Sequence, residues 1–354
     1  MDQIAALCNH STNFVTLDKM FQFHWLPAGW AHCSLGGLSQ QAFIGVGMTR
    51  PTVCVVIPAY NAETTLLRAL DSVAAQTLPP NKILVVDDAS SDATRSLAST
   101  YRKAAIDVIS TQTNVGAAGA RNQGIRAAAT DLVAFLDADD EWLPTKLEKQ
   151  VNLLVANQNS TFCSCGSNLI SPDGKDMGDI YRGQAITTGP EAWKALLKDN
   201  YVTTPSVLVW RRHLLALGGF EESLKIAEDQ DMWIRLAERG GLSYVSETLV
   251  QVHERKSSLS GGSLFDDQLT YTFPMIEHHL ERLSGRLSPK DRRSILGRRV
   301  LRLGQLAFSR DARDVGGQLI WRSISLGYKP WEGLLFLLKA NAAILWLKKA
   351  IRER

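Results

Sequence analysis

The chain has 354 residues, of which 45% are hydrophobic and 21% are charged, so its composition is that of a folded globular protein and excludes a largely disordered one. Its formal net charge is only +3, which gives no reason to expect a nucleic-acid partner. This length accommodates one large domain with an appendage, or two domains.

The charge is distributed unevenly along the chain. Residues 282–354 hold 17 Lys and Arg against 5 Asp and Glu, whereas the remaining residues hold 22 against 31. This contrast indicates an acidic body followed by a basic C-terminal region.

The five cysteines form no CxxC pair and lie near no His at zinc-finger spacing. We expect buried thiols in a reducing cytoplasm. The N-terminus lacks a charged segment followed by an apolar core, so no signal peptide is predicted. The cysteines are Cys8, Cys33, Cys54, Cys163 and Cys165.

Residues 1–47 show no sustained period, which predicts a poorly structured N-terminal extension. Two explanations stay open: either Met48 is the natural start, or the segment is a short structured extension.

From residue 51 onward, short apolar runs alternate with amphipathic stretches. Strand, helix, strand in this order predicts a parallel sheet with right-handed crossovers, and ligands then bind at the carboxyl ends of the strands. The predicted strands are Val53–Ile57, Ile83–Val86, Val108–Ser110 and Val133–Leu136. Two helical stripes are predicted, one of Leu66, Leu70, Val73 and Ala74, the other of Leu143, Leu147, Val151 and Leu154.

Past residue 160 the pattern changes. Phe162–Leu169 predicts a strand that enters a tight turn, and from about residue 265 the chain reads as helices only. We therefore expect an α/β domain over 48–260 and a basic helical region over 261–354. Within the α/β domain, after the strand Phe162–Leu169, we predict helices around 190–198 and 229–239, and strands near 242–246 and 249–253.

Polar residues follow three of the predicted strands where each strand ends. These are Pro58-Ala-Tyr60-Asn61, Asp87-Asp88 and Asp137-Ala-Asp139-Asp140. Asp and Asn also start turns and cap helices, but three such ends together predict an acidic binding rim. A D-x-D pair suits Mg²⁺ or Mn²⁺ completed by substrate phosphates, and Asp88 and Tyr60 could receive a nucleotide base.

Two further segments carry candidate residues. Asn114–Asn122 is rich in small residues and includes Gly116 and Arg121, but it is neither a dinucleotide fingerprint nor a P-loop. It either lets a substrate approach closely or only allows tight helix packing. The acids Glu228, Asp229 and Asp231 open a predicted helix, where its dipole alone would favour them.

Together, these motifs resemble the family 2 glycosyltransferases in order and spacing over about residues 51–260. The motifs are Pro58–Asn61, Val86–Ser91, Asn114–Asn122, Leu136–Asp140 and Glu228-Asp229. The resemblance implies a GT-A (Rossmann-like) α/β fold over 48–260, with a mixed, mainly parallel sheet flanked by helices, here with a C-terminal helical extension. It further implies inverting transfer from a nucleoside-diphosphate sugar, for which uridine is the commonest base, in bacterial polysaccharide or lipopolysaccharide assembly.

The resemblance also implies roles for individual residues. Asp229 would be the general base, and Asp139 would bind Mn²⁺ or Mg²⁺. Asp88 would read the base, Asp137 would lie near the ribose and metal, and His253 near the diphosphate. The other implied substrate-binding residues are Pro58, Tyr60, Asn61, Asn114, Gly116, Arg121 and Glu228.

This set suits the reaction, because a metal-bound diphosphate can leave without the proton donor that an inverting glycosidase needs. The expected acceptor is a saccharide or lipid-linked saccharide. The alternatives are a phosphotransferase with Asp137 as nucleophile and a non-catalytic sugar- or partner-binding homologue.

The apolar stretch Trp331–Leu347 is interrupted by polar residues and is a poor transmembrane span. Two alternatives stay open. The stretch either lies on an anionic membrane surface, so that a cytoplasmic enzyme makes peripheral membrane contact, or it docks on the catalytic domain.

Overall fold

The structure, a computed structural model, describes residues 49–181, 183–254, 264–309 and 312–339. The predicted N-terminal extension, Cys8, Cys33 and the last part of the Trp331–Leu347 stretch lie outside the described residues. Cys54, Cys163 and Cys165 are buried free thiols, as predicted.

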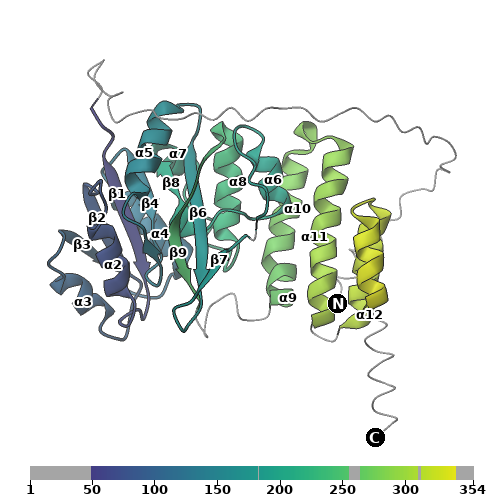
Figure 1. Cartoon of the computed structure of the whole chain (residues 1–354), viewed down its shortest axis with the longest axis horizontal. Helices are drawn as coiled ribbons and strands as arrows, with labels where there is room; N and C mark the ends of the chain where they lie inside the picture. The colour runs from purple at the N-terminus through teal and green to yellow at the C-terminus, as the bar shows by residue number, and fades with distance from the viewer. Residues whose placement is uncertain (1–48, 182, 255–263, 310–311, 340–354) are drawn as a thin grey trace, which may run out of the picture. The chain divides into compact units, whose positions relative to one another are not determined.

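The described chain contains a mixed nine-stranded sheet flanked by helices, with the C-terminal helices to one side of it (Figure 1). Its order is β3-β2-β1-β4-β8-β6-β9-β5, with β7 beside β6. The first four strands along the chain pair in parallel, as predicted, whereas β8, β5 and β7 pair antiparallel with their neighbours. The strands are β1 Val53–Ala59, β2 Lys82–Asp87, β3 Ile106–Ser110, β4 Leu132–Phe135, β5 Glu141–Trp142, β6 Phe162–Ile170, β7 Asp176–Asp179, β8 Leu208–Trp210 and β9 Leu242–His253.

Both faces of β1, β2 and β4 are buried, which explains the continuous apolar runs of these strands. Along β1, Val53, Val55 and Ile57 enter one core, whereas Cys54 and Val56 enter the other. One core contains residues of α2 Leu66–Ala74, α3 Thr94–Thr100 and α5 Lys146–Ala156. The other contains residues of α4 Gly116–Ala127, α6 Ala192–Lys198, α7 Arg211–Ala216 and α8 Glu228–Gly240.

The strands predicted near 242–246 and 249–253 are two halves of one strand, β9. Its parallel ladder with β6 shifts where Cys165 pairs with Val245 and the next residue, Gly166, pairs with Thr248. A Cβ on Gly166 would lie 2.8 Å from the Glu247 carbonyl oxygen, so only Gly accommodates this close approach. The sequence correctly predicted the two extended segments but not the bulge that joins them.

The parallel pairing brings the three predicted strand ends to one edge of the sheet. Ala59, at the end of β1, is in register with Asp87, at the end of β2. β4 pairs with β1 on its other side, so the acidic residues after Phe135 reach the same edge.

From residue 264 onward the described residues form helices joined by short turns, with no strand among them, as predicted. α10, α11 and α12 follow one another away from the sheet in Figure 1, and α11 contacts α6. No helix among the described residues is long and apolar enough to cross a membrane. The elements are α9 Leu264–Asp267, the π-helix η3 Gln268–Thr272, α10 Phe273–Arg282, α11 Pro289–Ser309 and α12 Arg313–Ser325; short 3-10 turns occupy η1 Thr204–Ser206 and η4 Ser284–Arg286.

The contact between α4 and β1 depends on a glycine. A Cβ on Gly124 would lie 2.3 Å from Cγ1 of Val56 in the sheet. We therefore expect Gly124→Ala to lower the free energy of unfolding in urea by about 1–3 kcal/mol through overpacking. Gly317→Ala in α12 is the control: nothing lies within 4 Å of its added Cβ. It should raise that free energy by about 0.4–1 kcal/mol. Equal stability of the two variants would contradict this packing.

Candidate active site

A buried guanidinium joins the end of β4 to the start of α8. Arg121, on α4 and only 5% exposed, donates to Oε1 of Glu228 and to Oδ1 of Asp137, both at 2.8 Å. Burial disfavours the charged form, but the two carboxylates outweigh it and raise the pKa of Arg121 above its ordinary value. Three of the predicted site residues are thus held together by two ion pairs.

Asp229 lies beside this cluster, next to Glu228 at the start of α8. Its Oδ2 accepts a hydrogen bond from the Asn200 side-chain amide at 3.2 Å, and its Oδ1 accepts from the backbone N–H of Gln230 at 2.6 Å. Burial and the negative charge of Glu228 raise the pKa of Asp229 to about 7, against the opposing effect of Arg121. A carboxylate with this pKa is suited to accept a proton near neutral pH.

The D-x-D segment meets the end of β9. Asp140 is buried and accepts the backbone N–H of His253 at 3.0 Å, while the His253 ring nitrogen Nε2 lies 3.0 Å from Oε1 of Glu141. Burial and the charges of Asp137 and Asp139 raise the pKa of Asp140 well above its ordinary value. Asp140 therefore anchors His253, whereas Asp137 and Asp139 are only half-buried.

Asp88 fixes the loop that leads into α4. It is 3% exposed and accepts the backbone N–H groups of Val115 and Gly116, both at 2.9 Å, as well as the Thr111 hydroxyl at 3.0 Å. Gly116 has φ +76° and also donates to Oδ1 of Asn114. An L side chain rarely adopts this backbone conformation, so glycine is required at this position.

The end of β1 is linked to the loop after β2. Asn61 adopts φ 46°, its Oδ1 accepts the Ser91 N–H at 2.9 Å, and its own N–H donates to Oγ of Ser90. Pro58 precedes this turn and is half-buried. The neighbouring Tyr60 ring is 51% exposed at the rim, where a flat ligand can stack on it.

Most of the predicted site residues therefore lie in four bonded groups at one sheet edge: the Arg121 cluster, the Asp88 loop, the Asp140–His253 contact and the Asn61 turn. α4 links the first two, because it begins at Gly116 and carries Arg121. Sequence reasoning missed Asn200. The only signal was an Asp-Asn pair after the helix predicted at 190–198, which reads as an ordinary helix end.

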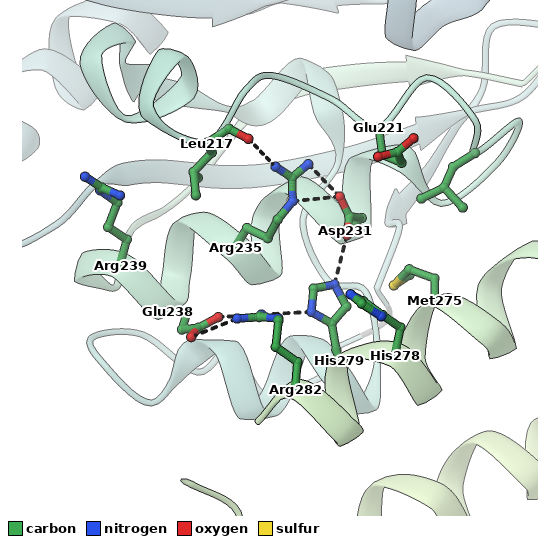
Figure 2. Close-up of a pocket in the computed structure, with 11 residues that line it drawn as sticks. Leu217, Glu221, Asp231, Arg235, Glu238, Arg239, Met275, His278, His279 and Arg282 are labelled. Carbon is green, nitrogen blue, oxygen red and sulfur yellow. Dashed lines mark hydrogen bonds and ion pairs between the residues drawn. The ribbon is translucent and has the colours of Figure 1, made fainter. Parts of the chain in front are cut away.

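Asp231 faces the other side of α8 and has a different environment. Two residues along a helix correspond to a rotation of about 200°, so Asp231 points away from Asp229. It accepts from Arg235 and from His279, each at 2.8 Å, beside a cavity of about 610 Å³ between α8 and α10 (Figure 2). Arg282 of α10 also forms an ion pair with Glu238 of α8. The His279–Asp231 and Arg282–Glu238 contacts in Figure 2 therefore both connect α10 to α8.

Comparison with known proteins is consistent with this geometry. The profile of Glycosyl transferase family 2 matches residues 54–205. The putative teichuronic acid biosynthesis glycosyltransferase TuaG of Bacillus subtilis (strain 168) is 30% identical over 215 residues, which cover 60% of this chain and 82% of TuaG. WfgD of Escherichia coli, a UDP-Glc:alpha-D-GlcNAc-diphosphoundecaprenol beta-1,3-glucosyltransferase, is 30% identical over 194 residues, 55% of this chain and 73% of WfgD.

Solved structures show the same fold. The crystal structure of S. aureus TarS 1–349 in complex with UDP-GlcNAc superposes with a TM-score of 0.52 at 19% identity, covering 78% of this chain and 92% of that one. The predicted GT-A architecture is confirmed.

The neighbours of Asp229 should control its ionisation in a measurable way. Asn200→Ala removes a hydrogen bond to the charged carboxylate, so the pKa of Asp229 should rise above about 7. Glu228→Gln removes a negative neighbour, so that pKa should fall. A ¹³C NMR titration of the side-chain carboxyl measures both shifts. Asn168→Ala is the control, since its amide donates to Asp176 instead; the same Asp229 pKa in all four proteins would refute these contacts.

Proposed function

This chain belongs to the family 2 glycosyltransferases, and we propose that it transfers a sugar with inversion from a nucleoside diphosphate, most commonly UDP in this family, to an acceptor hydroxyl. The observation that carries the proposal is the position of Asp229: its carboxyl has a pKa of about 7 and lies beside the ion pairs that join α8 to the D-x-D segment.

The proposed chemical step uses Asp229 as the general base. Its carboxylate takes the proton of the acceptor hydroxyl while that oxygen forms a bond to the anomeric carbon. The bond from the anomeric carbon to the diphosphate oxygen breaks on the opposite face, and the diphosphate leaves with the electron pair. Attack from the opposite face inverts the configuration at that carbon.

Arg121 and Glu228 serve this step by positioning. The guanidinium forms ion pairs with Glu228 and Asp137 and so fixes the start of α8 against the end of β4. The base and the diphosphate-binding end of the site are then held at a constant separation, which favours a productive geometry.

A divalent cation fits the acids at the end of β4. Among the described residues, no three His, Cys, Asp or Glu side chains gather into a ready-made metal cage. Mg²⁺ or Mn²⁺ needs no such cage when one or two carboxylates and the substrate phosphates complete its shell. The family resemblance assigns the cation to Asp139, the half-buried second acid of the D-x-D segment, and Asp139 would hold it here. When bound, the cation would stabilise charge on the leaving diphosphate.

The nucleoside would lie at the β1–β2 side of the rim. Tyr60 offers an exposed ring for stacking, and Asp88 supplies a carboxylate next to the loop of Asn114 and Gly116. His253, held by Asp140, would lie near the diphosphate. The acceptor would be a saccharide or a lipid-linked saccharide, the class that the name of WfgD states for that relative.

Asp229→Asn keeps the shape of the side chain but removes the proton acceptor. We expect kcat to fall by about 10²–10⁴, with donor affinity nearly unchanged. The parent kcat should rise with pH through about 7, the pKa of Asp229. The assay is release of nucleoside diphosphate with a polyprenyl-diphosphate-linked sugar as acceptor.

The matched control is Asp231→Asn, which should lower the melting temperature but keep kcat, because Asp231 fastens α10. If Asp229→Asn keeps its turnover and only melts earlier, the base is wrongly assigned. A parent protein without transferase activity would favour a non-catalytic homologue.

Asp139→Ala should abolish the part of nucleoside-diphosphate affinity that depends on Mn²⁺, because it removes the carboxylate that would hold the cation. Calorimetric titration of UDP with and without Mn²⁺ measures this difference. Asp140→Asn should retain it, since the raised pKa of Asp140 already favours a neutral group there. Equal UDP affinity of the parent protein with and without Mn²⁺ would rule out the metal site.

A further inference from the structure

Three large apolar side chains lie exposed along one helix, which spans residues 330–339. Trp331 is 78% exposed, Leu335 55% and Leu338 64%. Their spacing of four and three residues places them on a single face, the apolar stripe.

The opposite face of this helix is buried against α12. A Cβ on Gly333 would lie 3.0 Å from Ile324 and 3.3 Å from Ile320, so the backbone packs closely against both side chains. Because that contact fixes how the helix is turned, the apolar stripe points outward as a result of tertiary packing. It is not a core face that the described chain has left unfilled.

The apolar stripe differs from the rest of the described surface. The other large hydrophobic residues that are well exposed lie singly on separate elements. One of them, Trp321, lies on α12, the helix against which the stripe helix packs. Single exposed apolar side chains are ordinary, whereas a row of them marks an interaction surface. The scattered residues are Tyr60, Leu67, Val115, Met177 and Leu215.

The charge around the apolar stripe indicates the kind of partner. Over residues 312–339, which form α12 and the helix of the stripe, the chain carries four Lys and Arg against two Asp and Glu, and the exposed Lys339 directly follows Leu338. Glu332 forms an ion pair with Lys329 at 2.7 Å, so its negative charge is offset beside the stripe. The partner that this combination fits is apolar within and negatively charged at its surface.

We propose that the apolar stripe docks on an anionic lipid bilayer, with the helix lying in the plane of the interface. Leucine side chains enter the acyl boundary, the Trp331 indole lies at the level of the headgroups, and basic residues meet their phosphates. A second copy of the chain is a poorer occupant, because it would bring two strongly basic regions together. This surface is separate from the Asp229 site and does not depend on the transfer reaction.

Flotation of the full chain with vesicles tests the proposal. The protein should float with vesicles of phosphatidylcholine and about 30 mol% phosphatidylglycerol, and much less with phosphatidylcholine alone. Raising the salt from about 0.1 M to about 1 M should weaken binding, because the screening length falls from about 10 Å to about 3 Å.

Replacing the apolar stripe with serines (W331S, L335S and L338S combined) should lower partitioning at least about tenfold, since apolar burial drives interfacial binding. The matched control replaces three scattered exposed residues (L67S, M177S and L215S combined) and should bind like the parent. UDP affinity measured on both variants checks that they are folded.

Three results would overturn the proposal: a parent chain that does not float, undiminished flotation of the stripe variant, or a parent dimer that the stripe variant converts to a monomer. The vesicles contain no sugar acceptor, so failure here leaves the proposed transferase function standing. A parent chain that floats but does not bind UDP would contradict the proposed transferase function and leave the membrane proposal standing.

Discussion

The buried charge of Arg121 is the constraint on which the site depends. A guanidinium that is 5% exposed is costly to bury unless it is fully paired, and removing one partner of such a pair typically costs about 3–5 kcal/mol. Here the two partners, Asp137 and Glu228, lie 16 and 107 residues away along the chain. Any arrangement that separates α4, the end of β4 and the start of α8 would strand this charge, so the three elements are held in one relative position.

The acids that open α8 have different tasks because their surroundings differ. Glu228 pairs with Arg121, whereas Asp231 pairs with Arg235 and His279 on the far side of the helix. Asp229 receives hydrogen bonds from Asn200 and Gln230, but burial and the negative charge of Glu228 raise its pKa to about 7. The helix dipole favours all three acids equally and does not distinguish the base.

The C-terminal helices α10 and α11 contact residues next to the site. Asp199, which precedes Asn200, accepts from Arg298 of α11 at 3.0 Å, and α10 meets Asp231 through His279. The first contact lies one residue from Asn200, which donates to Asp229. The second lies two residues from Asp229 itself. The family profile ends at residue 205, so this support comes from a part of the chain outside the profile.

The sequence by itself determined the strands of the parallel half, the acidic residues at their ends, the family and the helical nature of the C-terminal region. Doubly buried strands leave long apolar runs, and strand-end motifs are local in sequence, so both can be read without a structure. β5 and β8 have two and three residues and leave no periodic signal, and the bulge in β9 depends on the close approach of Gly166 in another strand.

Only the tertiary structure decided which acid pairs with Arg121, which acid Asn200 touches and which face of the helix over 330–339 stays uncovered. These outcomes depend on contacts between distant segments, and a residue's own sequence neighbourhood carries no record of them.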